Sequence, residues 1–168
     1  MIIEFIRHAE AKGDKLSKFG KKQAKLLSKQ KDDFEFVKIY SSPLNRCLQT
    51  ANILAKAKKL PVVADERIKE RETLEDKPKT KEEQVWYDNY LNPKYSSFNP
   101  EGCKELLERV YSFLNEKIFE HYQKNENIII VSHSGIFYAV MAYFNKNKQG
   151  NINWYKLGNC SKIYFEIN

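Results

Sequence analysis

Apolar runs and amphipathic stretches alternate along the chain and predict strands and helices in turn. Runs rich in β-branched and aromatic residues predict strands at residues 2–6, 34–42, 60–66, 127–132 and 160–167. Apolar positions at helical spacing predict helices at residues 18–30, 43–59, 82–91, 103–124 and 136–144. This order indicates an α/β fold with helices on both faces of an open sheet. We find no repeat and no linker, so we expect a single domain over residues 1–168.

The charge balance narrows the class of partner. The chain has 29 lysines and arginines against 22 aspartates and glutamates, which gives a net charge of +7. Such an excess favours an anionic partner: nucleic acid, an acidic membrane surface or a phosphorylated small molecule. The lysines are spread among glutamates, without a dense basic block or a nucleic-acid-binding motif. We therefore expect a small phosphorylated substrate and no nucleic-acid partner.

Apolar stretches and cysteines bear on the compartment. No apolar stretch approaches the roughly 20 residues of a membrane span, and Glu4 and Arg7 interrupt the N-terminal run, unlike a signal peptide. Cys47, Cys103 and Cys160 lie far apart, without the spacing of a zinc site or a disulfide framework. We expect reduced thiols, no membrane partner and a cytoplasmic location. The oligomeric state, monomer or homodimer, stays open.

Polar side chains follow four of the predicted strands. Arg7 and His8 follow the first strand, Arg46 follows the second, glutamates within residues 66–72 follow the third, and His133 follows the fourth. In an open α/β sheet, ligands bind beyond the carboxyl ends of the strands. A lone histidine or arginine at a strand end is more often structural than functional. Four such coincidences at one edge of a sheet favour a functional site.

These residue types together suit phosphoryl transfer. Two arginines form an anion clamp that stays charged, and their charge disfavours protonated histidine nearby. A neutral imidazole is a competent nucleophile. The turn at Ser134 offers backbone N–H groups at a helix start, and a glutamate could protonate a leaving alkoxide. The set predicts a phosphohistidine intermediate, with no metal ion or other cofactor required.

An ordered series of segments resembles the histidine phosphatase superfamily, the phosphoglycerate mutase-like proteins. The segments are "IRHAEA", "LSKFGKKQAKLL", "YSSPLNRCLQTANIL", "DERIKERE", "IIIVSHSGI" and "LGNCSKIYFEI". They cover most of the chain, and the match is weakest between about residues 71 and 100. The resemblance implies a three-layer sandwich, with a mostly parallel sheet flanked by helices. It also implies a hydrolase of the histidine acid phosphatase type.

The resemblance also implies roles for individual residues. His8 would attack phosphorus and become phosphorylated. Arg7, Arg46 and His133 would hold the phosphoryl oxygens and stabilise the charge of the transition state. Glu70 would protonate the leaving group and later activate water.

The chain departs from the family pattern at several positions. Ala9 replaces the glycine that follows the first histidine, and we expect its backbone to be allowed. Asp14 stands near the place where many members have an asparagine on the phosphate; either its carboxylate points away or the local alignment differs. Ser134 replaces the first glycine of the "HGG" segment, and we expect it to contact phosphate. Glu72 and Glu75 are alternatives to Glu70 as the residue that protonates the leaving group.

Two other kinds of catalytic site fit parts of the sequence less well. "CKELLER" fits the C-x5-R signature of cysteine phosphatases through Cys103 and Arg109, but its leucines and glutamates have helical spacing and indicate the start of a helix. A metal site at His8 and His133 would be opposed by two arginines in the same pocket. The third histidine, His121, lies far along the long helix, where a structural or an exposed position is expected.

The function that these features favour is a metal-independent phosphomonoesterase, acting through phosphohistidine on a small phosphorylated metabolite. A phosphohistidine protein phosphatase and a phosphoglycerate mutase-type phosphotransferase are the alternatives. A catalytically silent phosphoester-binding or nucleic-acid-binding protein is the alternative from a different class. The short segment at residues 86–102 would form the substrate lid, and a mutase would need more cover to keep water out.

Overall fold

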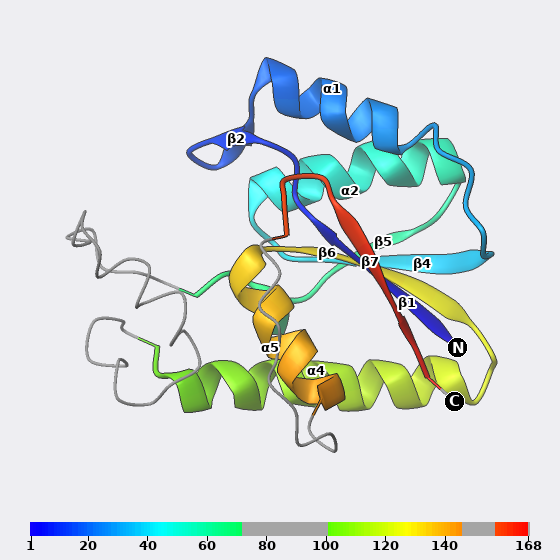
Figure 1. The fold of residues 1–168 in the computed structure, drawn as a ribbon, viewed down its shortest axis with the longest axis vertical. Helices are drawn as coiled ribbons and strands as arrows, with labels where there is room; N and C mark the ends of the chain where they lie inside the picture. Colours follow the sequence, from blue (N-terminus) through cyan, green and yellow to red (C-terminus); the bar gives the residue numbers. More distant parts are fainter. Residues whose placement is uncertain (72–100, 146–156, 168) are drawn as a thin grey trace.

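The computed structural model describes residues 1–71, 101–145 and 157–167 (Figure 1). In chain order the elements are β1 (Ile2–Arg7), β2 (Ala11–Lys12), β3 (Lys15–Leu16), α1 (Lys18–Leu27), β4 (Phe36–Ser41), α2 (Asn45–Lys58), β5 (Val62–Ala64), the 3₁₀ helix η1 (Glu66–Ile68), α4 (Cys103–Tyr122), β6 (Asn127–Ser132), α5 (Ser134–Asn145) and β7 (Lys162–Glu166).

A mostly parallel sheet forms the middle layer. Its strand order is β5-β4-β6-β1-β7, and every neighbouring pair is parallel except β1 and β7, which are antiparallel. Helices α1 and α2 lie on one face of the sheet, and α4 and α5 lie on the other (Figure 1). The predicted α/β sandwich with helices on both faces is therefore confirmed.

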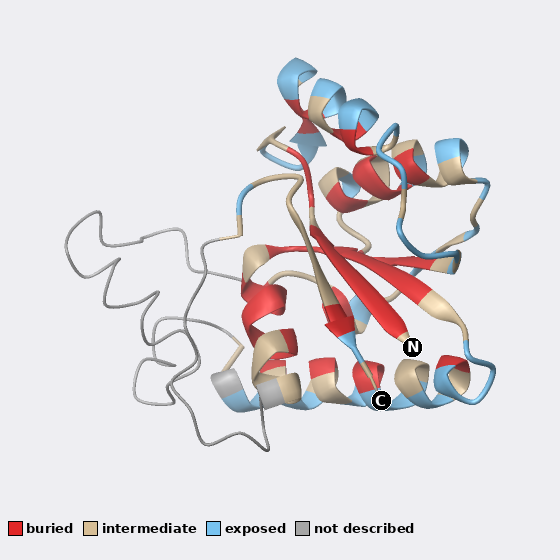
Figure 2. Ribbon diagram, turned by 45° about the vertical axis from the view of Figure 1, so that its right-hand side comes forward, coloured by how far each residue is buried: buried red, intermediate tan, exposed pale blue. Residues whose placement is uncertain are grey.

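Strand β6 shows how one sequence run fills two cores. Side chains of a strand point alternately to opposite faces of a sheet. Ile128 and Ile130 accordingly pack in the core under α4 and α5, whereas Ile129 and Val131 pack in the core under α2. All four side chains are fully buried, and Figure 2 shows the central strands buried along their length. Burial of each such side chain stabilises the fold by about 1.5–3 kcal/mol.

The start of α1 is fixed by a cap and a close contact. Ser17 caps the helix, because its Oγ accepts a hydrogen bond of 2.9 Å from the N–H of Gly20. A Cβ atom added at Gly20 would lie 1.9 Å from the carbonyl oxygen of Glu10. Only glycine therefore lets α1 approach the segment that follows the first histidine.

The start of α2 differs from the sequence-based expectation. We expected Pro43 to lie in the first helical turn. The helix instead begins at Asn45, after an N-cap residue, Leu44, with extended backbone (φ −66°, ψ 137°). Pro43 thus precedes the helix, and the predicted turn begins two residues later.

Two short elements were not predicted. The β2–β3 hairpin has two residues in each strand, and η1 has three residues. Segments of this length show too few positions for a period of 2 or 3.6 to emerge. The helix expected at residues 82–91 lies outside the described residues.

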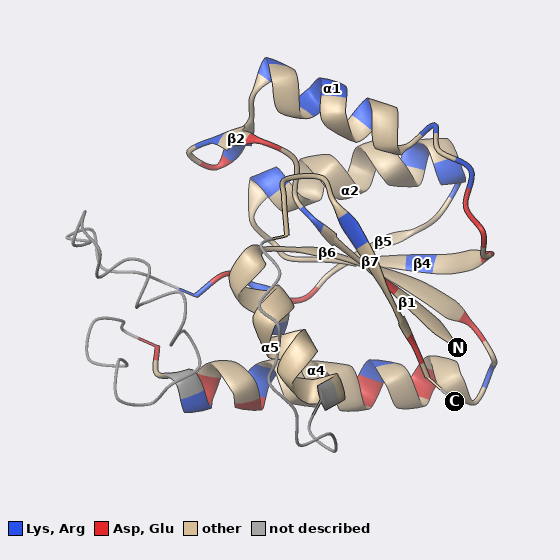
Figure 3. Ribbon diagram, viewed as in Figure 1, with Lys and Arg blue, Asp and Glu red and all other residues tan. Residues whose placement is uncertain are grey.

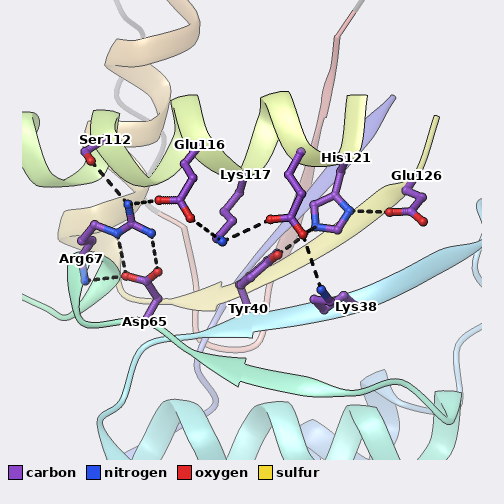
Figure 4. Close-up of polar contacts among 10 residues, drawn as sticks. Lys38, Tyr40, Asp65, Arg67, Ser112, Glu116, Lys117, His121 and Glu126 are labelled. Carbon is purple, nitrogen blue, oxygen red and sulfur yellow. Dashed lines mark hydrogen bonds and ion pairs between the residues drawn. The ribbon is translucent and has the colours of Figure 1, made fainter. Parts of the chain in front are cut away.

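His121 is structural. Its side chain is 1% exposed near the end of α4. Its Nε2 lies 2.8 Å from the Tyr40 hydroxyl, and its Nδ1 lies 2.7 Å from Oε2 of Glu126 (Figure 4). The carboxylate accepts the hydrogen bond from Nδ1–H. The two contacts join α4 to β4 and to the turn before β6.

Candidate active site

Four chain segments meet at the carboxyl ends of the parallel strands. Arg7 ends β1 and His8 follows it, Arg46 lies in the first turn of α2, and His133 directly follows β6. The imidazole rings of His8 and His133 lie 5.1 Å apart, centre to centre, at an interplanar angle of 65°. Glu70 follows η1 and reaches the start of α5. The structure thus brings together residues that are up to 126 positions apart in the sequence, counted from Arg7 to His133.

The protonation state of His8 follows from its surroundings. The residue is 9% exposed, and its Nδ1 lies 2.8 Å from the carbonyl oxygen of Ala9. A carbonyl oxygen only accepts, so Nδ1 carries the proton and Nε2 keeps its lone pair. Burial, with Arg46 and Arg7 adding to it, lowers the pKa of His8 to about 4. The imidazole is therefore neutral near pH 7.

His133 is more deeply enclosed and engages both ring nitrogens. Its Nδ1 lies 3.3 Å from Nη2 of Arg46, and its Nε2 lies 2.8 Å from Oγ of Ser42. Because a guanidinium only donates, Nδ1 is the acceptor and Nε2–H donates to the serine. Burial first, and then Arg46, lowers the pKa of His133 to about 2. The sequence predicted that the arginines would keep the histidines neutral; burial makes the larger contribution.

Arg7 is held by the loop that precedes β7. Its Nη1 donates to the carbonyl oxygen of Leu157 over 2.7 Å, and its backbone N–H donates to that of Ser161 over 3.1 Å. Its Nε is buried and has no hydrogen-bond partner within the described residues. A buried donor left unpaired costs about 1–3 kcal/mol. This donor therefore indicates a place for an anionic ligand.

Asp14 does not point away from the site. One carboxylate oxygen lies 3.3 Å from Nη1 of Arg46, and the other accepts a hydrogen bond of 2.9 Å from the amide of Asn45. The first alternative, a carboxylate that points away, is therefore wrong, and the second, a local alignment that differs, stays a prediction. The physical reason is that a guanidinium and a nearby carboxylate attract each other and form charge-assisted hydrogen bonds.

Glu70 has the surroundings of a proton donor. Its two carboxylate oxygens accept from the backbone N–H of Arg71 over 3.1 Å and of Gly135 over 3.4 Å. Burial raises the pKa of Glu70, although both N–H groups and the charges of Arg46 and Arg7 oppose this shift. The net direction favours the protonated carboxyl more than in water.

The segment that carries Glu70 is tied to α4. The Arg67 guanidinium donates to Asp65 and to Glu116, each over 2.7 Å (Figure 4). The Arg67 carbonyl oxygen accepts from Nη1 of Arg109 over 2.5 Å. The side chain and the backbone carbonyl of Arg67 thus both bond to α4. These bonds fix the position from which Glu70 extends.

The rejected cysteine phosphatase signature is part of a helix. Cys103 begins α4, as the leucine and glutamate spacing predicted. Arg109 forms a two-pronged ion pair with the carboxylate of Glu101, in which the Nη2–Oε2 distance is 2.7 Å. Its guanidinium is thus occupied by a carboxylate and by a carbonyl group, rather than arranged around a phosphate loop.

The roles of several residues that the sequence singled out stay predictions. Ser134 begins α5 directly after His133, and its contact with phosphate stays a prediction. Glu72 and Glu75 lie outside the described residues, as do residues 86–100 of the expected lid. Ala9 is fully buried and does not have a left-handed backbone, so the expectation that alanine is allowed there is confirmed.

Sequence reasoning missed the residues that support the first histidine. Thr50 Oγ1 accepts from the N–H of Ala9 over 3.1 Å and donates to the carbonyl oxygen of Arg46 over 2.8 Å. The Asn159 side chain donates to the carbonyl oxygen of His8 over 3.1 Å. Both lie in segments that resemble the family, which was the available signal. Their partners are backbone groups, and residue spacing does not reveal such partners.

Charge on the described surface is mixed. Figure 3 shows basic positions spread over several elements, with acidic positions among them on α4.

In residues 1–71, 101–145 and 157–167, no group of three or more histidine, cysteine, aspartate or glutamate side chains could hold a metal ion. Within the same ranges, none of the helices is both long and apolar enough to span a membrane.

Curated proteins with similar sequences are phosphatases. The chain is 29% identical over 151 residues to phosphoserine phosphatase 1 of Hydrogenobacter thermophilus, covering 77% of this chain and 69% of that protein. It is 25% identical over 162 residues to a probable phosphatase of Schizosaccharomyces pombe, covering 88% of this chain and 75% of that protein.

Solved structures share the fold. The alpha-ribazole phosphatase of Shigella flexneri matches with a TM-score of 0.75 at 23% identity, covering 100% of this chain and 91% of that one. A phosphoserine phosphatase mutant of Entamoeba histolytica, in complex with phosphoserine, matches with a TM-score of 0.74 at 23% identity, covering 99% of this chain and 91% of that one.

The family model of the histidine phosphatase superfamily (branch 1) matches residues 4–168. This range contains both arginines, both histidines and the glutamate that the structure gathers at the sheet edge. The chain therefore belongs to the histidine phosphatase superfamily, as a hydrolase of the phosphoglycerate mutase-like type.

Proposed function

We propose that the protein is a phosphomonoesterase that acts through a phosphohistidine at His8 on a small phosphorylated metabolite. The observation that carries this proposal is the state of the His8 ring, which donates Nδ1–H to Ala9 and leaves Nε2 unprotonated. A neutral imidazole with an available lone pair is a nucleophile at neutral pH. His133 has both nitrogens engaged, by Arg46 and Ser42, and this supports His8 as the residue that attacks.

In the first step the Nε2–P bond forms and the ester P–O bond breaks. Arg7 contributes its unpaired Nε–H, and Arg46 contributes its guanidinium, to the phosphoryl oxygens. The leaving alkoxide takes the proton of Glu70, whose raised pKa favours the protonated form.

In the second step water replaces the imidazole on phosphorus. The Glu70 carboxylate takes a proton from the attacking water, the N–P bond breaks, and inorganic phosphate leaves with His8 restored. His133 supports both steps by donating a hydrogen bond to a phosphoryl oxygen. Burial and the arginine charges lower its pKa, and a bound phosphate dianion offsets the arginine charges. No step needs a group that these side chains do not supply.

The substrate class rests on the relatives. The names of the matched proteins refer to phosphoserine and alpha-ribazole phosphatases, which act on small phosphorylated molecules. The net charge of +7 suits an anionic substrate of this class. We propose phosphoserine as the first metabolite to assay, with other small phosphomonoesters beside it.

The test is hydrolysis of an aryl phosphate with EDTA present, for the wild type and His8→Ala. We expect turnover that survives EDTA and falls at least about 1,000-fold in the variant. A matched variant, Lys12→Ala, alters an exposed residue of the nearby hairpin and should keep its activity. Equal activity in His8→Ala and wild type would refute the assignment of the nucleophile.

A trapping experiment follows the intermediate itself. Rapid quenching in alkali after addition of a ³²P-labelled ester should leave label on the wild-type protein and none on His8→Ala. Turnover without labelled protein at any quench time would contradict a covalent mechanism. Turnover of a phosphohistidine protein but of no small ester would replace the metabolite substrate with a protein substrate.

A further inference from the structure

Asp14 occupies the turn of a small hairpin beside the site. β2 and β3 pair antiparallel, and Gly13 and Asp14 form the two residues between them. Gly13 has a φ of 60°, a conformation that suits glycine at the first position of such a turn. The N–H of Leu16, whose side chain is buried, donates to Gln49 of α2 over 3.0 Å. The turn is thus attached to the helix that carries the second arginine.

The Asp14 carboxylate binds the first turn of α2 through both oxygens. Oδ2 accepts from the Asn45 amide over 2.9 Å, and Oδ1 lies 3.3 Å from Nη1 of Arg46. Leu44, at the N-cap position of this helix, provides no side-chain cap. A carboxylate therefore fills a position where a helix start and a guanidinium both favour an anion.

The two Nη atoms of Arg46 therefore face different partners. Its Nη2 faces His133 at 3.3 Å, and its Nη1 faces Asp14, also at 3.3 Å. A substrate phosphoryl group that takes Nη1 must displace this carboxylate or lie beside it. Either way the bound dianion meets a like charge that an asparagine at the same position would not present.

Other charged groups near the turn do not cancel this effect. The carboxylate of Glu10 is engaged by the Ser17 hydroxyl at 2.6 Å. Lys12 and Lys15 flank the turn and are exposed, so solvent screens their charges. The Asp14 side chain is itself 45% exposed, which leaves it room to swing into solvent when a ligand arrives.

We propose that Asp14 competes with phosphate dianions for Arg46 and so weakens the binding of inorganic phosphate, the product. This inference rests on the proposed function of the site. It predicts that the enzyme releases phosphate readily and that phosphate, as product, inhibits the enzyme only weakly. It also predicts a higher KM for phosphomonoesters than the same site would have with an uncharged residue at position 14.

The test is calorimetric titration of inorganic phosphate into the wild type, Asp14→Asn and Asp14→Ala at pH 7 and low salt. Loss of the carboxylate should lower the Kd for phosphate about three- to tenfold in both variants, the size expected of a half-exposed charge. Asp33→Asn is the matched control, because it removes the same charge from an exposed position outside the site. Its Kd should equal that of the wild type.

Four outcomes are decisive. A tighter Kd in both Asp14 variants, with a parallel fall in the inhibition constant of phosphate, supports the competition. An unchanged Kd in both would overturn it and leave the proposed function standing. A gain confined to Asp14→Asn would also overturn it, since the new amide would then be the cause. If no variant binds phosphate and none hydrolyses an aryl ester, the proposed function fails as well.

Discussion

Mild acid should destabilise this protein through its two site histidines. Burial is the main cause that lowers the pKa of His8 to about 4 and that of His133 to about 2. The charges of Arg46 and Arg7 lower both values further. In the unfolded chain each imidazole returns to a pKa of about 6.5. Between these values the unfolded chain binds protons that the folded site excludes. The stability that neutral histidine contributes is thus complete above pH 6.5 and is lost as the pH falls.

The size of the effect follows from these pKa values. Between pH 7 and pH 5, protonation of the unfolded chain should remove about 2 kcal/mol per histidine, or about 4 kcal/mol for both. A domain of this kind has a total free energy of unfolding of about 5–15 kcal/mol. The two side chains could therefore account for a large share of the acid sensitivity.

The measurement is urea unfolding at pH 7, 6 and 5 in a phosphate-free buffer, for the wild type, His8→Gln and His133→Gln. Glutamine is polar and does not titrate. The loss of stability between pH 7 and pH 5 should shrink by about 2 kcal/mol in each variant. All other titrating groups are common to the three proteins, so their contributions cancel in the difference.

The reasoning fails if all three proteins lose the same stability between pH 7 and pH 5. Such a result would mean that the folded histidines accept protons as readily as the unfolded ones. Added phosphate provides a second check, because an anion between the arginines should raise the pKa of both histidines and flatten the wild-type profile.

Three further substitutions test separate parts of the site and fold. Glu70→Gln should lower kcat for alkyl phosphates at least about 100-fold but affect aryl phosphates far less, because aryl leaving groups need little protonation; paired assays of both esters measure this. Arg46→Lys should lower kcat/KM about 100-fold, since one ammonium cannot replace a guanidinium that faces His133 and that we propose to bind a phosphoryl oxygen. Gly20→Ala should cost about 3 kcal/mol in urea unfolding, because the new Cβ would meet the carbonyl oxygen of Glu10 at 1.9 Å.

Each of these has a control or a contrary outcome. Glu66→Gln removes an exposed carboxylate of η1 and should leave both classes of ester unaffected. Equal losses for alkyl and aryl esters in Glu70→Gln would count against the acid role. Near-normal activity in Arg46→Lys would show that charge alone suffices there. Lys21→Ala, an exposed change one residue beyond Gly20, should shift stability by less than about 0.5 kcal/mol.

The fold was predictable because strand and helix periods were unambiguous in the core. The run at residues 127–132 is apolar at four consecutive positions, and those four side chains do fill both faces of the sheet. Elements of two or three residues left no such periodic signal. The boundary of α2 also escaped prediction, because the proline suggested an earlier start than the backbone of Leu44 permits.

The site was predictable as a set of residue types, and less so as a set of contacts. Strand ends and family-like segments indicated His8 and Arg46, but they did not reveal Thr50, which joins the backbones of Ala9 and Arg46. The contact of Asp14 with Arg46 was not predicted, because we expected the carboxylate to point away from a bound dianion or the local alignment to differ. Its carboxylate oxygen in fact lies 3.3 Å from Nη1 of Arg46.

The bonds from the Arg7–His8 segment to the loop before β7 have a consequence for biosynthesis. Arg7 contacts the Leu157 carbonyl 150 residues later, and the His8 carbonyl contacts Asn159 151 residues later. A ribosome therefore makes the Arg7–His8 segment about 150 residues before the loop that supports it. Contacts of such long sequence separation form late in folding, because the intervening chain must first be ordered. A growing chain should therefore be unable to hydrolyse phosphate esters until the loop at residues 157–161 has left the ribosome, and activity should appear only after that point.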